Sequence, residues 1–149
     1  MKAFFTDLFE YHHHFNTETG LLMRAHLEQI PEEFPALFSH MLNAHQIWNS
    51  RILQTPSFGV HQNHLPQTWA SIDEANFKNS LLILESRDLA ETIAYTNSQG
   101  TGFVNSIQEI LFHAANHHSH HRAQIMSGLR KAGFEPLATD YIFYKRKQA

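Results

Sequence analysis

The sequence contains no cysteine, although 13 of its 149 residues are histidine. The lack of thiols excludes a disulfide scaffold, a thiolate zinc site, an iron–sulfur cluster and a cysteine nucleophile. An excess of positive charge is also missing, since the net charge is −3 with neutral histidines. This charge disfavours a nucleic-acid partner, because a general nucleic-acid interface needs a basic face. Imidazole, carboxylate and hydroxyl groups remain as the reactive chemistry.

Long apolar runs are absent as well. The longest aliphatic run has only four residues, 81–84, whereas a membrane-spanning helix needs about 20. Asp7 and Glu10 interrupt the first residues where a signal peptide requires an unbroken apolar segment. We therefore expect a cytoplasmic protein without a membrane segment. The apolar content of 42% is sufficient for the core of a single domain over residues 1–149.

Apolar residues at helical spacing predict an all-α fold with four amphipathic helices, over about residues 3–29, 31–53, 71–85 and 106–131. The spacing Ser-x-x-Glu of a capping box occurs at Ser71–Glu74 and at Ser106–Glu109, and we expect each to begin a helix. Residues 92–96 are predicted to form a strand, to which residues 102–104 pair in a small hairpin before the last helix. These elements indicate a four-helix bundle.

Several local features complete this prediction. The buried face of the third helix is expected to carry Phe77, Leu81 and Leu84, with Leu82 beside them, and Phe4 is expected among the apolar positions of the first helix. Residues 97–100 have the composition of a turn. Gly133 is expected in the left-handed conformation that ends a helix. The apolar tail, residues 141–144, is expected to dock on the bundle.

The predicted fourth helix contains five histidines within nine residues, namely His113, His117, His118, His120 and His121. Neutral imidazole is the most common protein ligand for transition metals. Histidines four residues apart share one helix face about 6 Å apart along the axis, so His113/His117 and His117/His121 both suit one ion. His113 and His121, about 12 Å apart, are too distant to share it. Further ligands must come from another helix. The second predicted helix offers His40 and His45, and the first offers residues 12–14.

Helical periodicity does not choose among these histidines. His118 and His121 lie nearest the centre of the apolar stripe of the fourth helix, and His117 lies towards its edge. On the second helix His45 is central and His40 is at an edge, about 140° away, so these two should not bind the same ion. An inward histidine can equally be a hydrogen-bonded core residue, and residues 12–14, 26, 61 and 64 are interpreted as surface positions. The pattern predicts an interhelical histidine site without selecting its members.

The segment from Asn116 to Gln124, Asn-His-His-Ser-His-His-Arg-Ala-Gln, resembles the Asn-His-x-x-x-His-Arg-Gly-Gln signature of the DinB-like (DinB/YfiT-like) metalloenzymes, with Ala123 in place of glycine. Phe38-Ser-His-Met41, followed by Trp48, is similar to the histidine segment on the second helix of that family. The resemblance implies a four-helix bundle, often a homodimer. It also implies one metal ligand from the second helix and two from the fourth, which are His40, His117 and His121; the rival ligands are His45, His118 and His13.

The resemblance further implies a small-molecule substrate and a hydrolase or thiol-dependent S-transferase activity. Three imidazoles would leave a position for water or for a low-molecular-weight thiol on a divalent transition metal, zinc or nickel first and iron or copper as alternatives. Asn116, Arg122 and Gln124 are candidates for orienting the ligands, and the alternative for Arg122 is a surface salt bridge. The competing function is a non-catalytic, dimeric metal-binding bundle in interaction or stress response. A closed shell of four ligands would favour that alternative.

The sequence lacks the motifs that define other metal-binding helical bundles and other classes of hydrolase. A di-iron carboxylate site needs Glu-x-x-His on two helices, and this spacing occurs only once, at Glu10–His13. The sequence has no His-Glu-x-x-His, so a zincin protease is excluded. No nucleophile elbow of a serine hydrolase is recognisable, and nothing specifically supports a bis-histidine haem site.

Overall fold

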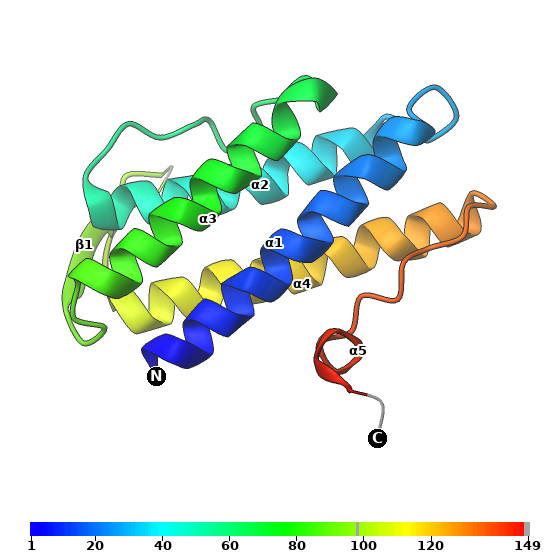
Figure 1. The fold of residues 1–149 in the computed structure, drawn as a ribbon. Coiled ribbons are helices and arrows are strands. Elements are labelled where there is room, and N and C mark those ends of the chain that lie inside the picture. Colours follow the sequence, from blue (N-terminus) through cyan, green and yellow to red (C-terminus); the bar gives the residue numbers. More distant parts are fainter. Residues whose placement is uncertain (98, 148–149) are drawn as a thin grey trace.

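The computed structural model describes residues 1–97 and 99–147 (Figure 1). Four long helices form the predicted all-α bundle: α1 (Lys2–Ala25), α2 (Glu33–Leu53), α3 (Trp69–Ser86) and α4 (Ile107–Lys131). A short 3-10 helix, η1 (Pro66–Thr68), leads into α3, and a short helix, α5 (Tyr141–Lys145), follows α4. Among the described residues, no helix combines the length and the hydropathy that a bilayer crossing requires.

The predicted hairpin is present at one end of the bundle, directly before α4 (Figure 1). Strand β1 (Thr92–Thr96) pairs antiparallel with β2 (Gly102–Ser106), so that Thr92 lies opposite Ser106 and Thr96 opposite Gly102. The predicted turn between them includes Ser98, which lies outside the described residues. Gly100 has a φ of 79°, a left-handed conformation that glycine adopts without strain.

Two of the predicted helix ends are confirmed at α4. The Ser106 side chain accepts a hydrogen bond from the Glu109 N–H, and the Glu109 carboxylate accepts one from the Ser106 N–H, which completes a capping box. After α4, Gly133 has a φ of 89°, as expected for a residue just beyond a helix end.

Two other predicted ends are wrong. The Ser71–Glu74 capping box does not form, because the chain is already helical at Trp69 after η1 and the Ser71 hydroxyl donates to the Thr68 carbonyl instead. The first helix stops at Ala25 rather than near residue 29, because His26 leaves the helical conformation with a φ of −126°. The N–H of Gln29 then bonds to the His26 carbonyl in a turn.

The core consists of two apolar clusters separated by polar side chains. One cluster lies at the hairpin end and includes Phe9, Ile83 and Leu111; the other lies at the opposite end of the bundle and includes Phe38, Trp69 and Ile125. Between them is a set of side chains, each less than 5% exposed, which we call the polar layer: His12, Asn16, His45, Asn49, Asp73, Asn76, Ser80, His118 and Arg122. Burial of so many polar groups is tolerated only where they bond to one another.

The polar layer corrects the predicted burial of α3. The side of α3 that faces the bundle carries Asp73, Asn76 and Ser80 before it reaches Ile83. Leu82 is 49% exposed, and Phe77 and Leu81 are half-buried at the margin of the core cluster, so the buried face of this helix is displaced from the predicted stripe towards Asn76 and Ser80. Leu84 is buried as predicted.

The first helix also differs from prediction at its beginning, where Phe4 is 53% exposed.

The tail docks on α1 as expected. The Tyr11 hydroxyl donates to the Thr139 carbonyl at 2.6 Å, and the rings of Tyr141 and Tyr144 lie 5.3 and 5.7 Å from the Tyr11 ring.

Candidate metal centre

Helices α2 and α4 bring three histidines together. His40 comes from α2, whereas His117 and His121 come from one face of α4, as their spacing of four residues requires. Each offers one ring nitrogen, and these three atoms all lie within 4.8 Å of one another. Within residues 1–97 and 99–147, no other group of three or more histidine, aspartate or glutamate side chains converges in this way.

The donor set fits a transition metal. The Nε2 atoms of His117 and His121 are 3.1 Å apart. Two nitrogens bound to a tetrahedral zinc ion at about 2.0–2.1 Å are roughly 3.3 Å from each other, so little movement is needed to bind one. Three imidazole nitrogens suit zinc, nickel, copper or iron, and they do not distinguish among these metals.

Two of the three rings are oriented by hydrogen bonds on the side away from the convergence point. His40 Nδ1 is 3.1 Å from the Val60 carbonyl, which can only accept, so Nδ1 donates and Nε2 keeps its lone pair. His121 Nδ1 is 2.7 Å from Gln124 Oε1, with the same consequence for its Nε2. Gln124, which the sequence offers as an orienting residue, thus contacts a candidate ligand. Val60 lies in the connection between α2 and α3, where no pattern in the sequence indicated a role.

The electrostatic environment keeps the α4 ligands neutral. Burial, reinforced by the nearby imidazoles of His121, His40 and His113, lowers the pKa of His117 to about 3. Burial also lowers the pKa of His121, and the bond to Gln124 opposes this shift. Both rings are therefore unprotonated at neutral pH, which is the form that binds a metal.

The rival ligands lie elsewhere. His45 and His118 both point inward, as periodicity predicted, but they bond to each other across 2.9 Å within the polar layer. His13 stacks on the Phe77 ring at 4.6 Å, and its Nδ1 is 2.6 Å from an oxygen of Asp73. None of the three contributes to the converging set.

Asn116 and Arg122, the other two residues proposed from the α4 signature to orient the ligands, lie in different environments. Asn116 is exposed, and its side chain forms no hydrogen bond with the described part of the chain. The alternative of a surface salt bridge for Arg122 is wrong, because its side chain is 1% exposed. Its guanidinium donates to Asn16 Oδ1 and to His12 Nδ1, each at 3.2 Å, and lies 4.9 Å from the centre of the Tyr11 ring.

The interpretation of residues 12–14 as surface is wrong for His12, which is only 1% exposed. A signal for its burial was present in the sequence. His12, Asn16 and Thr19 continue, at spacings of three and four residues, the stripe that begins with Phe5 and Phe9 and resumes at Met23. Because His12, Asn16 and Thr19 are polar, a search for apolar residues at helical spacing does not include them in the buried face.

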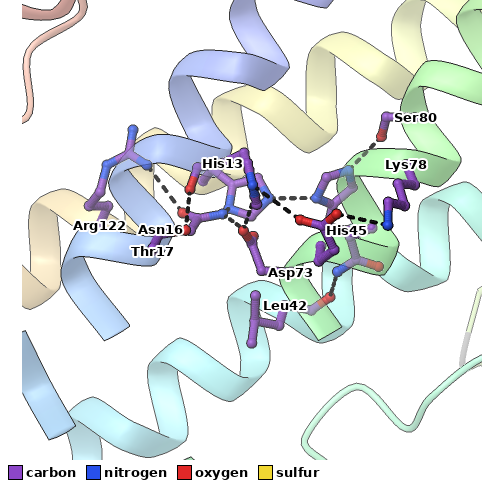
Figure 2. A network of polar contacts seen from close by, with 12 residues as sticks. His13, Asn16, Thr17, Leu42, His45, Asp73, Lys78, Ser80 and Arg122 are labelled. Atoms are coloured by element: carbon purple, nitrogen blue, oxygen red, sulfur yellow. Dashed lines mark hydrogen bonds and ion pairs between the residues drawn. The ribbon is translucent and has the colours of Figure 1, made fainter. Parts of the chain in front are cut away.

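The polar layer forms a directed chain of hydrogen bonds, part of which Figure 2 shows. Asn16 Nδ2 donates to Asp73 Oδ1 at 2.7 Å and lies 3.3 Å from His118 Nδ1. Because an amide nitrogen can only donate, His118 Nδ1 is the acceptor in this contact. His118 Nε2 then donates to His45 Nδ1 at 2.9 Å, and His45 Nε2 donates to Ser80 Oγ at 2.7 Å. Both imidazoles are neutral in this pattern. Burial accordingly lowers the pKa of His45 to about 3 and holds that of His118 well below its usual value.

Further histidines surround the triad without joining it. His61, interpreted as a surface residue, is exposed and stacks on the His40 ring at 5.5 Å. His113 lies 5.7 Å from the His117 ring, and the His120 ring is 4.9 Å from that of His121. Their ligand atoms lie outside the converging set, so three ligands are available among the described residues.

Fold and site together define a helical bundle with a three-histidine site that could hold a metal ion. The model of the DinB family matches residues 11–149, and the chain belongs to that family. This match confirms the resemblance seen in the α4 signature. A search of curated proteins and a search of solved structures each find no significant match.

Proposed function

We propose that the protein is a divalent-metal-dependent enzyme of hydrolase or thiol-dependent S-transferase type, with His40, His117 and His121 as the metal ligands. The observation that carries this proposal is the number of ligands: three imidazoles converge, and no fourth histidine, aspartate or glutamate joins them among the described residues. Structural zinc sites close with four protein ligands, whereas catalytic sites keep one position open. A bound ion would supply Lewis-acid chemistry, favouring the deprotonated form of a water or thiol at its open position.

The chain's own side chains support this assignment. The Val60 carbonyl and Gln124 hold the rings of His40 and His121 with their Nε2 lone pairs free, and His117 stays neutral. Because the chain has no cysteine, any sulfur nucleophile must arrive on a small molecule. The substrate is accordingly a small electrophile, with a low-molecular-weight thiol as its partner in the transferase variant of the proposal.

Metal analysis of tag-free protein tests the proposal. We expect about one zinc or nickel ion per chain. After cobalt substitution, 2-mercaptoethanol is expected to add a thiolate-to-cobalt charge-transfer band, because the open position admits a thiol. Turnover would then be screened with ester substrates and with thiol-reactive aryl halides. Absence of stoichiometric metal would contradict the site, and a cobalt spectrum that neither thiol nor azide changes would contradict an open position.

The pH dependence of metal binding should reveal the depressed pKa of His117. Protons compete with the metal for each ligand, and every proton displaced adds at most one decade of affinity per pH unit. Since the pKa of His117 is about 3, this ring releases no proton between pH 7.5 and 6. We therefore expect the zinc affinity to fall by no more than about 1.2 decades in total between these two pH values, which is the contribution of two imidazoles with the reference pKa of about 6.5. Competition with a chromophoric chelator would measure it. A fall of about 1.7 decades, the contribution of three such imidazoles, would contradict this environment for His117.

A further inference from the structure

Arg51, in the last turn of α2, is a half-buried arginine whose guanidinium packs against two aromatic rings that are nearly perpendicular to each other. Its central carbon is 4.1 Å from the centre of the Trp48 ring and 4.4 Å from that of Tyr95, on β1 of the hairpin. The two rings meet edge to face at 5.1 Å. The Arg51 side chain forms no hydrogen bond and no ion pair with any residue within 1–97 and 99–147, so the N–H groups of its guanidinium have no protein acceptor there.

The two other arginines that are not fully exposed have partners. Arg87 pairs with Glu91 and also donates to the Ile52 carbonyl, and Arg122 donates to two side chains of the polar layer. Arg24, Arg130 and Arg146 are exposed. Arg51 instead packs in the corner formed by two perpendicular rings, which orients the guanidinium and leaves its N–H donors for an external acceptor. A guanidinium offers its donors in a planar fork that matches a carboxylate or a phosphate.

The position of Arg51 relates it to the candidate metal centre. Arg51 follows His40 by 11 residues, or three helical turns, so the two lie within about 20° of each other on α2 and about 16 Å apart along its axis. On α4, His113 fills the interval. Its ring is 4.9 Å from that of Trp48 and 5.7 Å from that of His117. A continuous row of rings therefore joins the guanidinium to the three ligands.

We propose that Arg51, held against Trp48 and Tyr95, is an anion-binding subsite of the metal centre, and that the substrate or cosubstrate is an elongated organic anion. Its carboxylate or phosphate binds Arg51 while its reacting group lies at the His40/His117/His121 site. This inference rests on the proposed function for the role of the metal, whereas the anion site itself stands on the geometry of Arg51. It narrows the small-molecule class to compounds whose anionic group is several bonds away from the reacting atom.

A series of dicarboxylates tests the proposal because one carboxylate can bind zinc while the other reaches Arg51. Binding of acids from succinate to sebacate to the zinc-loaded protein would be measured by calorimetry, with propionate as the single-carboxylate reference. One chain length is expected to bind at least about tenfold more tightly than propionate, since a hydrogen bond to a charged group contributes that much. Arg51→Met keeps most of the packing stem and is expected to remove this preference.

Arg146→Met is a matched control, because Arg146 also lies over an aromatic ring, that of Phe143 at 4.4 Å, but on the docked tail. This variant should keep the wild-type preference for chain length. Thermal unfolding of Arg51→Met would verify that the hairpin and bundle remain folded. Binding by a folded Arg51→Met protein as tight as wild type would overturn the proposal and leave Arg51 as packing between α2 and the hairpin.

The metal-free protein separates this inference from the proposed function. Glutarate and inorganic phosphate are expected to quench the fluorescence of Trp48 in protein treated with a chelator, and Arg51→Met should abolish the quenching. Trp69, which is 2% exposed in the core, provides a constant background. If zinc fails to bind but this quenching persists, the metal site is wrong and the anion site stands. If zinc binds but Arg51→Met does not change the fluorescence quenching by glutarate or by phosphate, the anion site is wrong and the metal site stands.

Discussion

His117→Ala and His121→Ala are each expected to weaken zinc binding by about a hundred- to a thousandfold. Four-ligand zinc sites bind with about 10–16 kcal/mol, or roughly 2.5–4 kcal/mol per ligand, and each 1.4 kcal/mol corresponds to a factor of ten. The remaining nitrogens cannot compensate, because only three histidines converge among the described residues. Competition with a chromophoric chelator at constant pH would measure the loss.

His113→Ala is the matched control for these two variants. His113 and His117 form the other pair at a spacing of four residues on α4, and the His113 ring is 5.7 Å from that of His117. Its nitrogens are outside the converging set, so the zinc affinity should change by less than about threefold, as for a surface substitution. A loss in His113→Ala as large as that in His121→Ala would place the ion between the wrong pair and contradict the site.

Acid is expected to unfold the metal-free protein, because the free energy of unfolding falls more and more steeply below about pH 6.5, by about 4 kcal/mol per pH unit once the pH is about one unit lower. His12, His45 and His118 are at most 4% exposed, and burial lowers the pKa of each. In the unfolded chain they titrate near 6.5. As the pH falls well below that value, the unfolded state comes to bind about three more protons than the folded state, at about 1.4 kcal/mol per proton and pH unit. A domain with about 5–15 kcal/mol of stability cannot absorb this over several pH units.

His13 acts in the opposite sense without cancelling the effect. Its hydrogen bond to Asp73 raises its pKa, so its contribution to stability is complete below the unfolded value and is lost only as the pH rises through the folded value. It therefore adds no slope below about pH 6.5. The imidazoles whose pKa is lowered in the folded state, which are the three buried ones together with His117 and His121, determine the sign there: the free energy of unfolding falls as the pH falls.

Urea unfolding of chelator-treated protein between pH 7 and pH 5.5, followed by circular dichroism, would measure this slope. His45→Gln removes one of these imidazoles and should reduce the slope by up to about a quarter, because His117, with a pKa of about 3, also takes up its proton only on unfolding. This reduction is expected whatever the substitution does to the stability at pH 7. His14→Gln changes an exposed histidine and should leave the slope unchanged. A wild-type free energy that is constant across this range would show that the buried histidines accept protons without unfolding.

The candidate ligands could be predicted only in part from residue spacing. A spacing of four residues on α4 selects two pairs, and periodicity places His45 nearest the centre of the α2 stripe and His118 and His121 nearest that of α4. His45 and His118 are buried, but a buried pair that satisfies its own hydrogen bonds has no lone pair left for an ion. His121 is only half-buried, and it joins the converging set. The converging histidines lie at the margin of the α2–α4 contact, where apolar periodicity is weak. The resemblance to the DinB family, and not the helical wheel, selected His40.

The polar layer was the part of the fold least accessible to sequence reasoning. Hydropathy places Asp73 and Asn76 on a solvated face, and only their partners on other helices make their burial favourable. Those partners are separated by tens of residues in the chain, so no local pattern reports them. The Ser106 capping box, in contrast, depends on four consecutive residues and was predicted correctly.

The polar layer also sets the register of α4 within the bundle. Sliding α4 by one turn, about 5.4 Å, would still leave an aliphatic residue at some places in both apolar clusters, with Leu111 where Ile107 lies and Leu129 where Ile125 lies. The same slip would take His118 away from His45 and Arg122 away from Asn16, leaving buried polar groups without partners. Each such neutral group costs about 1–3 kcal/mol, and a buried guanidinium costs more. Side chains that offer no ligand atom thereby determine the height along the bundle at which His117 and His121 meet His40.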